Sequence, residues 1–415
     1  MTRPDSIDLR ALLSSAEDAS PASAVETVAE HLREQVGAER VSFWIADAAG
    51  QALLLMPSGE RLEIAGTSAG SAWLEQEVGR DESWWLPVTV RGDAIGVLEV
   101  RLDEAAESPE DLGEQLSAVA HLLAYIIVAN QRHTDEYERA RRSESFELSM
   151  EVQYQLLPEA FVCEGGSFRL AGWLEPSSTA GGDTFDYTVS RDRLTVSLID
   201  AVGHDVGAAM LATLTISAMR KARRDGGDLR DQAAAAQAAL IRHGDDEDYA
   251  TGIIIEIDLD SRKQEDPATG GADADRATTD SGVIRARMLN AGHPLPRLVR
   301  DGKLSHVELT PDPPFGLDDQ QVHGDYTAHG VELDPGDRLV LLTDGMYERS
   351  AESFDLDDHL VRTADLHPRN AVQKIAAAFR EHVESAPEDD ATFLLLDWCG
   401  GDTERDTEGG SDIQS

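Results

Sequence analysis

The sequence is poor in cysteine and in lysine. Cys163 and Cys399 are the only cysteines among 415 residues. Two cysteines are too few for a disulfide framework, so we expect a reducing, cytoplasmic location. Lysine occurs four times and arginine supplies the other basic residues. This bias fits either a salt-adapted organism or a GC-rich genome.

Positive charge is scarce throughout the chain. Asp and Glu number 79 against 36 Lys and Arg, which gives a formal net charge of −43. So acidic a chain argues against nucleic acid and anionic membrane surfaces as partners. No apolar run approaches the roughly 20 residues that span a bilayer, and the N-terminus has no apolar signal region. The length suits about two or three soluble domains.

The N-terminal part alternates between helical and strand patterns. Residues 20–36 show helical apolar spacing before a glycine, and residues 41–45 alternate as a strand does. Residues 86–90 and 95–100 flank Arg91-Gly92-Asp93, which indicates a hairpin. Over residues 15–130 the order of helix, meander, helix, hairpin and helix resembles a GAF sensor domain.

The GAF resemblance implies a small-molecule ligand in a pocket above the sheet. Trp73, Trp84 and Trp85 are candidates for lining such a pocket. The alternative is that these side chains are core or dimer contacts. The sequence contains no nucleotide-specific motif, so it does not identify the ligand.

Residues 112–157 are predicted to form one long helix or two joined helices. Apolar stripes at both ends flank a stretch of alternating charge, as in a coil between domains. We therefore assign residues 131–158 to a helical linker that forms a homodimer; a monomeric surface helix is the alternative. Residues 264–281 and the tail 400–415 have the composition of disordered segments.

Four aspartate-bearing motifs mark the C-terminal half. They are Gly181-Gly182-Asp183-Thr184-Phe185-Asp186, Asp200-Ala201-Val202-Gly203-His204-Asp205, Thr343-Asp344-Gly345 and Glu388-Asp389-Asp390-Ala391-Thr392. Each lies at a predicted strand end or a glycine turn. Carboxylates gathered at one point repel each other unless cations neutralise them, and hard oxygen ligands select Mg²⁺ or Mn²⁺. Strands dominate over βαβ units, which predicts an α+β fold with antiparallel sheets.

These motifs, with Asn290-Ala291-Gly292-His293-Pro294 between the second and third, resemble the SpoIIE/RsbU-like branch of the PPM-type serine/threonine phosphatases. The resemblance covers residues 145–398, and we assign the phosphatase domain to residues 159–399. It implies a two-sheet antiparallel β-sandwich flanked by helices and a site for two Mn²⁺ or Mg²⁺ ions. Two such ions acidify a shared water and neutralise phosphoryl oxygens. The implied metal ligands and catalytic residues are Asp183, Asp200, the backbone carbonyl of Ala201, Asp344 and Asp389.

Neighbouring polar residues have competing interpretations. Asp186 is a further ligand or, as we expect, a residue that fixes its loop, and Asp390 is expected to support the ligands. His204 and His293 are either general acids or structural residues. Thr184 and Asp205 depart from the family pattern, and Arg169 is a weak candidate for binding substrate phosphate.

The resemblance implies an enzyme that hydrolyses phosphoserine or phosphothreonine on a signalling protein under GAF control. By analogy the substrate is a phosphorylated anti-sigma-factor antagonist of the STAS type. Two alternatives remain: a non-catalytic module that binds a phosphoprotein, and a phosphatase for small molecules.

Overall fold

The fold is described from a computed structural model. It describes residues 6–102, 111–142, 146–177, 181–203, 205–245, 247–259, 283–317, 326–347, 351, 353–383, 387 and 389–400. The chain forms two compact units that divide between residues 145 and 146. Of the segments predicted to be disordered, residues 264–281 and all of the tail 400–415 except Gly400 lie outside the described residues.

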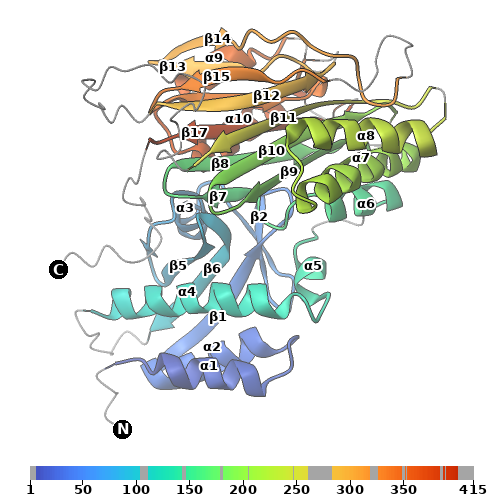
Figure 1. Ribbon diagram of the computed structural model, residues 1–415. Helices are drawn as coiled ribbons and strands as arrows, with labels where there is room; N and C mark the ends of the chain where they lie inside the picture. The colour runs from blue at the N-terminus through green and yellow to red at the C-terminus, as the bar shows by residue number, and fades with distance from the viewer. Residues whose placement is uncertain are drawn as a thin grey trace, which may run out of the picture. The chain divides into compact units, whose positions relative to one another are not determined.

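The first unit is built on one antiparallel sheet with the strand order β3-β2-β1-β6-β5-β4 (Figure 1). Its elements are α1 (Leu9–Asp18), α2 (Ala24–Val36), β1 (Ala38–Ala46), β2 (Ala52–Leu55), β3 (Arg61–Glu63), α3 (Ser68–Glu75), β4 (Gly79–Arg80), β5 (Trp84–Val90), β6 (Asp93–Leu102), α4 (Leu112–Asn130) and α5 (Glu136–Ala140). The observed order of helices and strands follows the predicted one, with α1 as an addition. The identity of this unit as a GAF domain stays a prediction.

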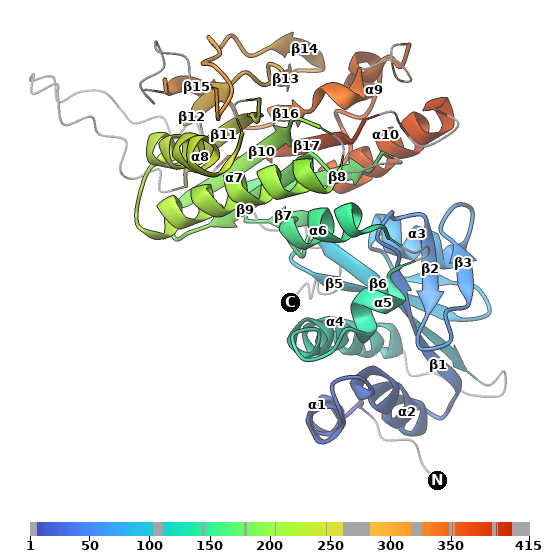
Figure 2. The same cartoon turned by 90° about the vertical axis from the view of Figure 1, so that its right-hand side faces the viewer.

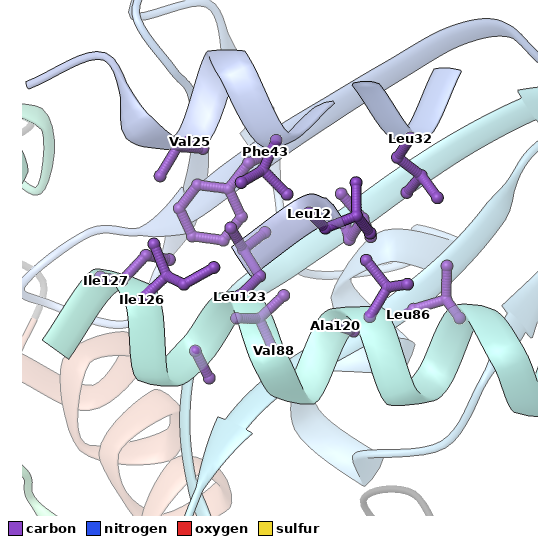
Figure 3. Packing of buried hydrophobic residues seen from close by; sticks show 14 of the residues in the cluster. Leu12, Val25, Leu32, Phe43, Leu86, Val88, Ala120, Leu123, Ile126 and Ile127 are labelled. Carbon is purple, nitrogen blue, oxygen red and sulfur yellow. The ribbon is translucent and has the colours of Figure 1, made fainter. Parts of the chain in front are cut away.

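The core of the first unit lies between the sheet and the helices α1, α2 and α4. Figure 3 shows their side chains gathered around Phe43, among them Leu12, Val25 and Leu123. A smaller cluster under α3 fills the other face of the sheet. Among the described residues, α4 is the one helix long and apolar enough to cross a membrane by length and composition. This corrects the expectation that no such run exists, and its buried face forms part of this core.

The linker is not one continuous helix. Helix α4 ends at Asn130, a turn follows, and the five-residue α5 and the separate α6 (Leu148–Leu156) are the other helical parts. In α5 only Tyr137 is buried, and its hydroxyl donates to the Pro21 carbonyl at 3.1 Å. Alternating charge without a continuous apolar stripe has no surface to bury, so a long helix gains little there.

The second unit contains two antiparallel sheets and helices on both outer faces (Figure 2). The five-stranded sheet has the order β15-β12-β11-β10-β9, and the six-stranded sheet has the order β14-β13-β16-β17-β8-β7. The strands are β7 (Val162–Glu164), β8 (Phe168–Glu175), β9 (Asp183–Val189), β10 (Arg193–Ala201), β11 (Ala250–Asp258), β12 (Ile284–Ala291), β13 (Arg297–Arg300), β14 (Lys303–His306), β15 (His329–Leu333), β16 (Arg338–Leu342) and β17 (Ala391–Trp398). The predicted α+β class with antiparallel sheets is confirmed for this unit.

Strand alternation builds the layers of the second unit. In β10, Leu194, Val196 and Leu198 enter the core between the sheets, while Ile199 faces α7 (Val206–Arg224) and α8 (Leu229–His243). Strand β16 is buried on both faces, because the second outer face carries α9 (Leu356–Arg362) and α10 (Pro368–Val383). The short helix η2 (Asp344–Met346) follows β16 directly.

Candidate metal-dependent active site

Two of the predicted ligands, Asp183 and Asp200, lie opposite each other on neighbouring strands. Asp183 begins β9, Asp200 lies one residue before the end of β10, and the two are partners in the antiparallel ladder. Directly opposed residues of such a ladder are about 4.5–5.5 Å apart and share a face of the sheet. The β9–β10 hairpin therefore brings both carboxylates to the same end of the five-stranded sheet.

Gly182 packs closely against two of the predicted oxygen donors. A Cβ atom on Gly182 would lie 2.4 Å from the carbonyl oxygen of Ala201 and 3.3 Å from Oδ1 of Asp200. The Ala201 amide in turn donates to the Gly182 carbonyl at 3.1 Å. A side chain at position 182 would therefore displace the Ala201 carbonyl, which is one of the predicted ligands.

The other two predicted ligands come from the six-stranded sheet. Asp344 is exposed at the start of η2, and Asp389 is half-buried just before β17. The loops that carry them are in close contact, since a Cβ on Gly345 would lie 2.0 Å from the Asp390 carbonyl oxygen. Asp344 and Asp389 therefore lie on adjoining loops beside the paired strands β16 and β17.

Asp183 connects the two sheets through hydrogen bonds. Its buried carboxylate accepts from the hydroxyls of Thr343 at 2.8 Å and Thr392 at 2.5 Å. Burial, followed by the charges of Asp200 and Asp390, raises the pKa of Asp183 well above its ordinary value. A divalent cation would relieve this concentration of negative charge.

The donor set suits hard cations. Four carboxylates and one backbone carbonyl are the oxygen ligands that Mg²⁺ and Mn²⁺ prefer, and the raised pKa of Asp183 beside Asp200 and Asp390 fits a cation there. Within the described ranges, no group of three or more His, Cys, Asp or Glu side chains is arranged so that it could hold a metal ion. The chemistry of the donors fits the implied metals, while the donors do not form a closed cage. The ligand assignment stays a prediction.

Asp390 organises the backbone around the site. Its carboxylate accepts from the amides of Ser177 at 2.8 Å and Gly181 at 3.1 Å, and from the Gln153 side chain at 2.5 Å. Gln153 also donates to the Asp183 carbonyl at 2.8 Å and is fully buried. No role was predicted for Gln153. Its place as a polar residue on the buried face of α6 is the feature of the sequence that could have indicated one.

Asp186 is occupied by two arginines of α7. Its carboxylate accepts from Arg220 at 2.9 and 3.2 Å and from Arg223 at 2.9 Å. Arg220 also donates to the Leu156 carbonyl at 2.7 Å, at the end of α6. Asp186 therefore ties β9 to α7 and α6 instead of fixing its own loop, and both of its oxygens already have cationic partners.

His293 is buried next to the site and uncharged. Burial lowers its pKa to about 3, opposed by the backbone of Leu342. Its ring contacts the Thr251 hydroxyl at 2.9 Å, and its backbone exchanges two hydrogen bonds with the Asn290 side chain. These contacts describe a structural residue. The other histidine candidate, His204, lies outside the described residues.

The two departures from the family pattern have local explanations. Asp205 is the N-cap of α7, where it accepts from the Gly207 amide at 2.7 Å. A carboxylate at a helix N-terminus is stabilised by the free amides and the helix dipole. Thr184 is fully buried in β9 opposite Ile199.

Arg169 is far from the site. It lies near the start of β8 and pairs in register with Asp397 and Glu164, whereas Glu175 at the other end of β8 pairs with Ala391. Six strand residues span about 20 Å. The suggestion that Arg169 binds substrate phosphate is therefore wrong.

The three tryptophans of the first unit pack in its core. Trp73 and Trp85 belong to the cluster under α3, and Trp84 packs on the opposite face. Their contacts support the core interpretation over the ligand-pocket one. A cavity of about 280 Å³ in this unit lies between β2, the β2–β3 turn and α5, and contains none of the three.

Comparison with known proteins agrees with the motifs. Residues 190–265 and 270–399 match the family model described as Stage II sporulation protein E (SpoIIE). The chain therefore belongs to the SpoIIE family, and the matched residues lie in its second unit. No curated protein sequence matches the chain.

The solved structures that are similar to the chain include the following three. The RsbU and RsbW domains of Rv1364c from Mycobacterium tuberculosis are 22% identical with a TM-score of 0.45, covering 59% of this chain and 62% of that one. The PP2C phosphatase domain and regulatory fragment of SpoIIE from Bacillus subtilis are 19% identical with a TM-score of 0.42, covering 56% and 64%. The SiaA-PP2C domain of Pseudomonas aeruginosa is 19% identical with a TM-score of 0.43, covering 55% and 85%. The match thus spans less than two thirds of the first two.

Proposed function

We propose that the chain is a metal-dependent protein serine/threonine phosphatase that is controlled by its N-terminal unit. The observation that supports the proposal is that Asp183 and Asp200 lie opposite each other at one end of the β9–β10 hairpin, with the Ala201 carbonyl packed against Gly182 beside them. The adjoining loops of Asp344 and Asp389 complete the donor set.

The residues of the chain have separable tasks in this function. The four aspartates and the Ala201 carbonyl hold two metal ions, which when bound acidify a water and neutralise the phosphoryl oxygens. Thr343 and Thr392 orient the Asp183 carboxylate through their hydroxyl groups. Asp390 orders the backbone that leads into β9. Buried and uncharged His293 supports the loop before β13 and takes no proton.

Hydrolysis assays on the full-length protein test this function. Turnover of p-nitrophenyl phosphate and of a phosphoserine peptide is expected with Mn²⁺ or Mg²⁺ and not with EDTA. Asp200→Asn and Asp344→Asn are expected to lose more than the roughly 10- to 100-fold that a change beside a metal ligand costs. Asp225→Asn, at the exposed C-cap of α7, is the matched control and keeps full activity. Full activity of either ligand variant would refute the assignment.

The alternative is a phosphoprotein-binding module without turnover. It is favoured by one observation, that the donors among the described residues do not form a closed metal cage. This alternative predicts Mn²⁺ binding by calorimetry without hydrolysis of any phosphopeptide.

We further infer the biological setting from the resemblance. The substrate is a phosphorylated signalling protein, by analogy a STAS-type anti-sigma-factor antagonist, in the cytoplasm. The first unit senses a small molecule as a GAF domain, and residues 131–158 transmit the signal within a homodimer. Comparing full-length protein with a chain that begins at residue 146, where the second unit begins, measures the direction of control. Light scattering measures the mass of the assembly.

A further inference from the structure

Arg297 is a buried cation next to the loop that carries Asp344. It is the first residue of β13 and only 7% exposed. Its Nε lies 2.7 Å from Oδ1 of Asp357 in the first turn of α9, and its Cζ lies 4.8 Å from the ring centroid of Tyr347. Burial lowers the pKa of Arg297, opposed by Asp357. A guanidinium withdrawn from water interacts more strongly with an aromatic ring than an exposed one does.

Tyr347 closes the turn that begins with Asp344. The Tyr347 amide donates to the Asp344 carbonyl at 2.8 Å. The other end of the turn is fixed by Thr343, whose amide donates to the Thr392 carbonyl at 3.0 Å. The strand β17 therefore holds the turn before Asp344, and the ring contact with Arg297 holds it after Asp344. Asp344 itself is exposed, so its carboxylate position depends on how this turn is held, by these two contacts and by the packing of Gly345 and Met346.

We propose that Arg297 is a positioning residue for the metal site: through Tyr347 and Asp357 it fixes the turn of Asp344 and so sets the affinity for the cation that Asp344 binds. This rests on the proposed function, because it requires Asp344 to be a metal ligand. The physical reason is that a ligand held in place loses less conformational freedom when the cation binds.

Arg300 on the same strand provides an internal comparison. It also pairs with carboxylates, with Nε 2.8 Å from Asp337 and Nη1 3.0 Å from Asp334. Neither partner belongs to the Asp344 turn. A purely structural role for strand β13 arginines predicts that Arg297 and Arg300 substitutions act alike, whereas the positioning role predicts a difference in metal affinity.

The test measures Mn²⁺ binding to the full-length protein by isothermal titration calorimetry, together with the Mn²⁺ concentration that half-activates hydrolysis. Asp344→Asn identifies the binding event that depends on this ligand. Arg297→Met is expected to weaken that event about five- to tenfold, at the lower edge of changes beside a metal ligand, and to leave any other binding event unchanged. Arg300→Met is expected to leave both events unchanged.

Tyr347 variants distinguish loss of the ring contact with Arg297 from general destabilisation of the fold. The Tyr347 hydroxyl has no hydrogen-bond partner among the described residues, so Tyr347→Phe is expected to behave as wild type. Tyr347→Leu is expected to reproduce the Arg297→Met shift, and the double variant to add nothing further. If Arg297→Met fails to fold, Arg297→Lys keeps the charge but not the planar stacking group, and a smaller shift in the same binding event is expected.

Three results would overturn the proposal. The first is unchanged Mn²⁺ binding together with a lower Tm for Arg297→Met, or for Arg297→Lys if the Arg297→Met variant does not fold. The second is additive behaviour of Arg297→Met and Tyr347→Leu. The third is unchanged Mn²⁺ binding in Asp344→Asn, which would remove the ligand assignment as well. Absence of turnover with the expected binding shifts would instead refute the phosphatase function and leave the positioning role supported.

Discussion

Asp186→Asn is expected to destabilise the second unit by about 2–3 kcal/mol without changing its affinity for Mn²⁺. The carboxylate is buried and accepts hydrogen bonds from two arginines of α7, Arg220 and Arg223. The amide keeps the shape of the side chain but removes its charge. Both guanidinium groups would then face each other without an anion between them.

The magnitude follows from burial on both sides of this ion pair. Removing one partner of a buried pair typically costs about 3–5 kcal/mol. The side chains of Arg220 and Arg223 are 23% and 18% exposed against 7% for Asp186, so partial solvation reduces the cost to about 2–3 kcal/mol. For a unit of this size that corresponds to a fall in Tm of about 5–10 °C.

Urea unfolding and calorimetry with Mn²⁺ measure the two quantities separately. The matched control is Asp225→Asn, which removes an exposed pair with Lys221 on the same helix and is expected to cost less than about 0.5 kcal/mol. Unchanged stability of Asp186→Asn with Mn²⁺ binding weakened tenfold or more would refute the reasoning, and would make Asp186 a metal ligand after all.

Three further predictions concern the site itself. Asp183→Asn is expected to abolish turnover and to raise the Tm in EDTA at pH 7. The raised pKa of the Asp183 carboxyl means that the metal-free protein loses stability as the pH rises above the ordinary carboxyl range, and the neutral amide avoids this loss. An unchanged Tm would contradict this. Gly182→Ala is expected to weaken Mn²⁺ binding at least about tenfold, because its Cβ would lie 2.4 Å from the carbonyl oxygen of Ala201. Gly330→Ala is the control, because its Cβ would meet nothing closer than 3.5 Å. Gln153→Leu removes one buried donor from both the Asp183 carbonyl and the Asp390 carboxylate and should cost about 1–3 kcal/mol in urea unfolding. A similar cost for the exposed Gln155→Leu on the same helix would exclude that explanation.

Sequence patterns predicted the strands that lead into the aspartate motifs, because the core of the second unit enforces a period of two. Leu194, Val196 and Leu198 face the core, and the same alternation places Asp200 at the strand end where the motif expected it. The family motifs then supplied candidate ligands, of which the structure brings Asp183 and Asp200 together on one hairpin. Local periodicity was sufficient for these features.

Contacts between distant segments were not predictable from local pattern. The Thr392 hydroxyl donates to the carboxylate of Asp183, 209 positions away. Gln153 and Asp390 are separated by 237 positions. The prediction of a continuous linker helix was wrong for a different reason. Alternating charges favour a helix in isolation, but tertiary packing decides whether the helix continues.

The hairpin register of β9 and β10 has a consequence for how such chains change by insertion and deletion. Side chains alternate between the two faces of a strand, so losing one residue between Asp183 and the end of β9 at Val189 would move the carboxylate to the opposite face of the sheet. Residues 190–192 lie between the strands and carry no side chain of the site. An insertion there leaves the alternation within both strands unchanged, whereas a single codon lost within β9 turns Asp183 away from Asp200.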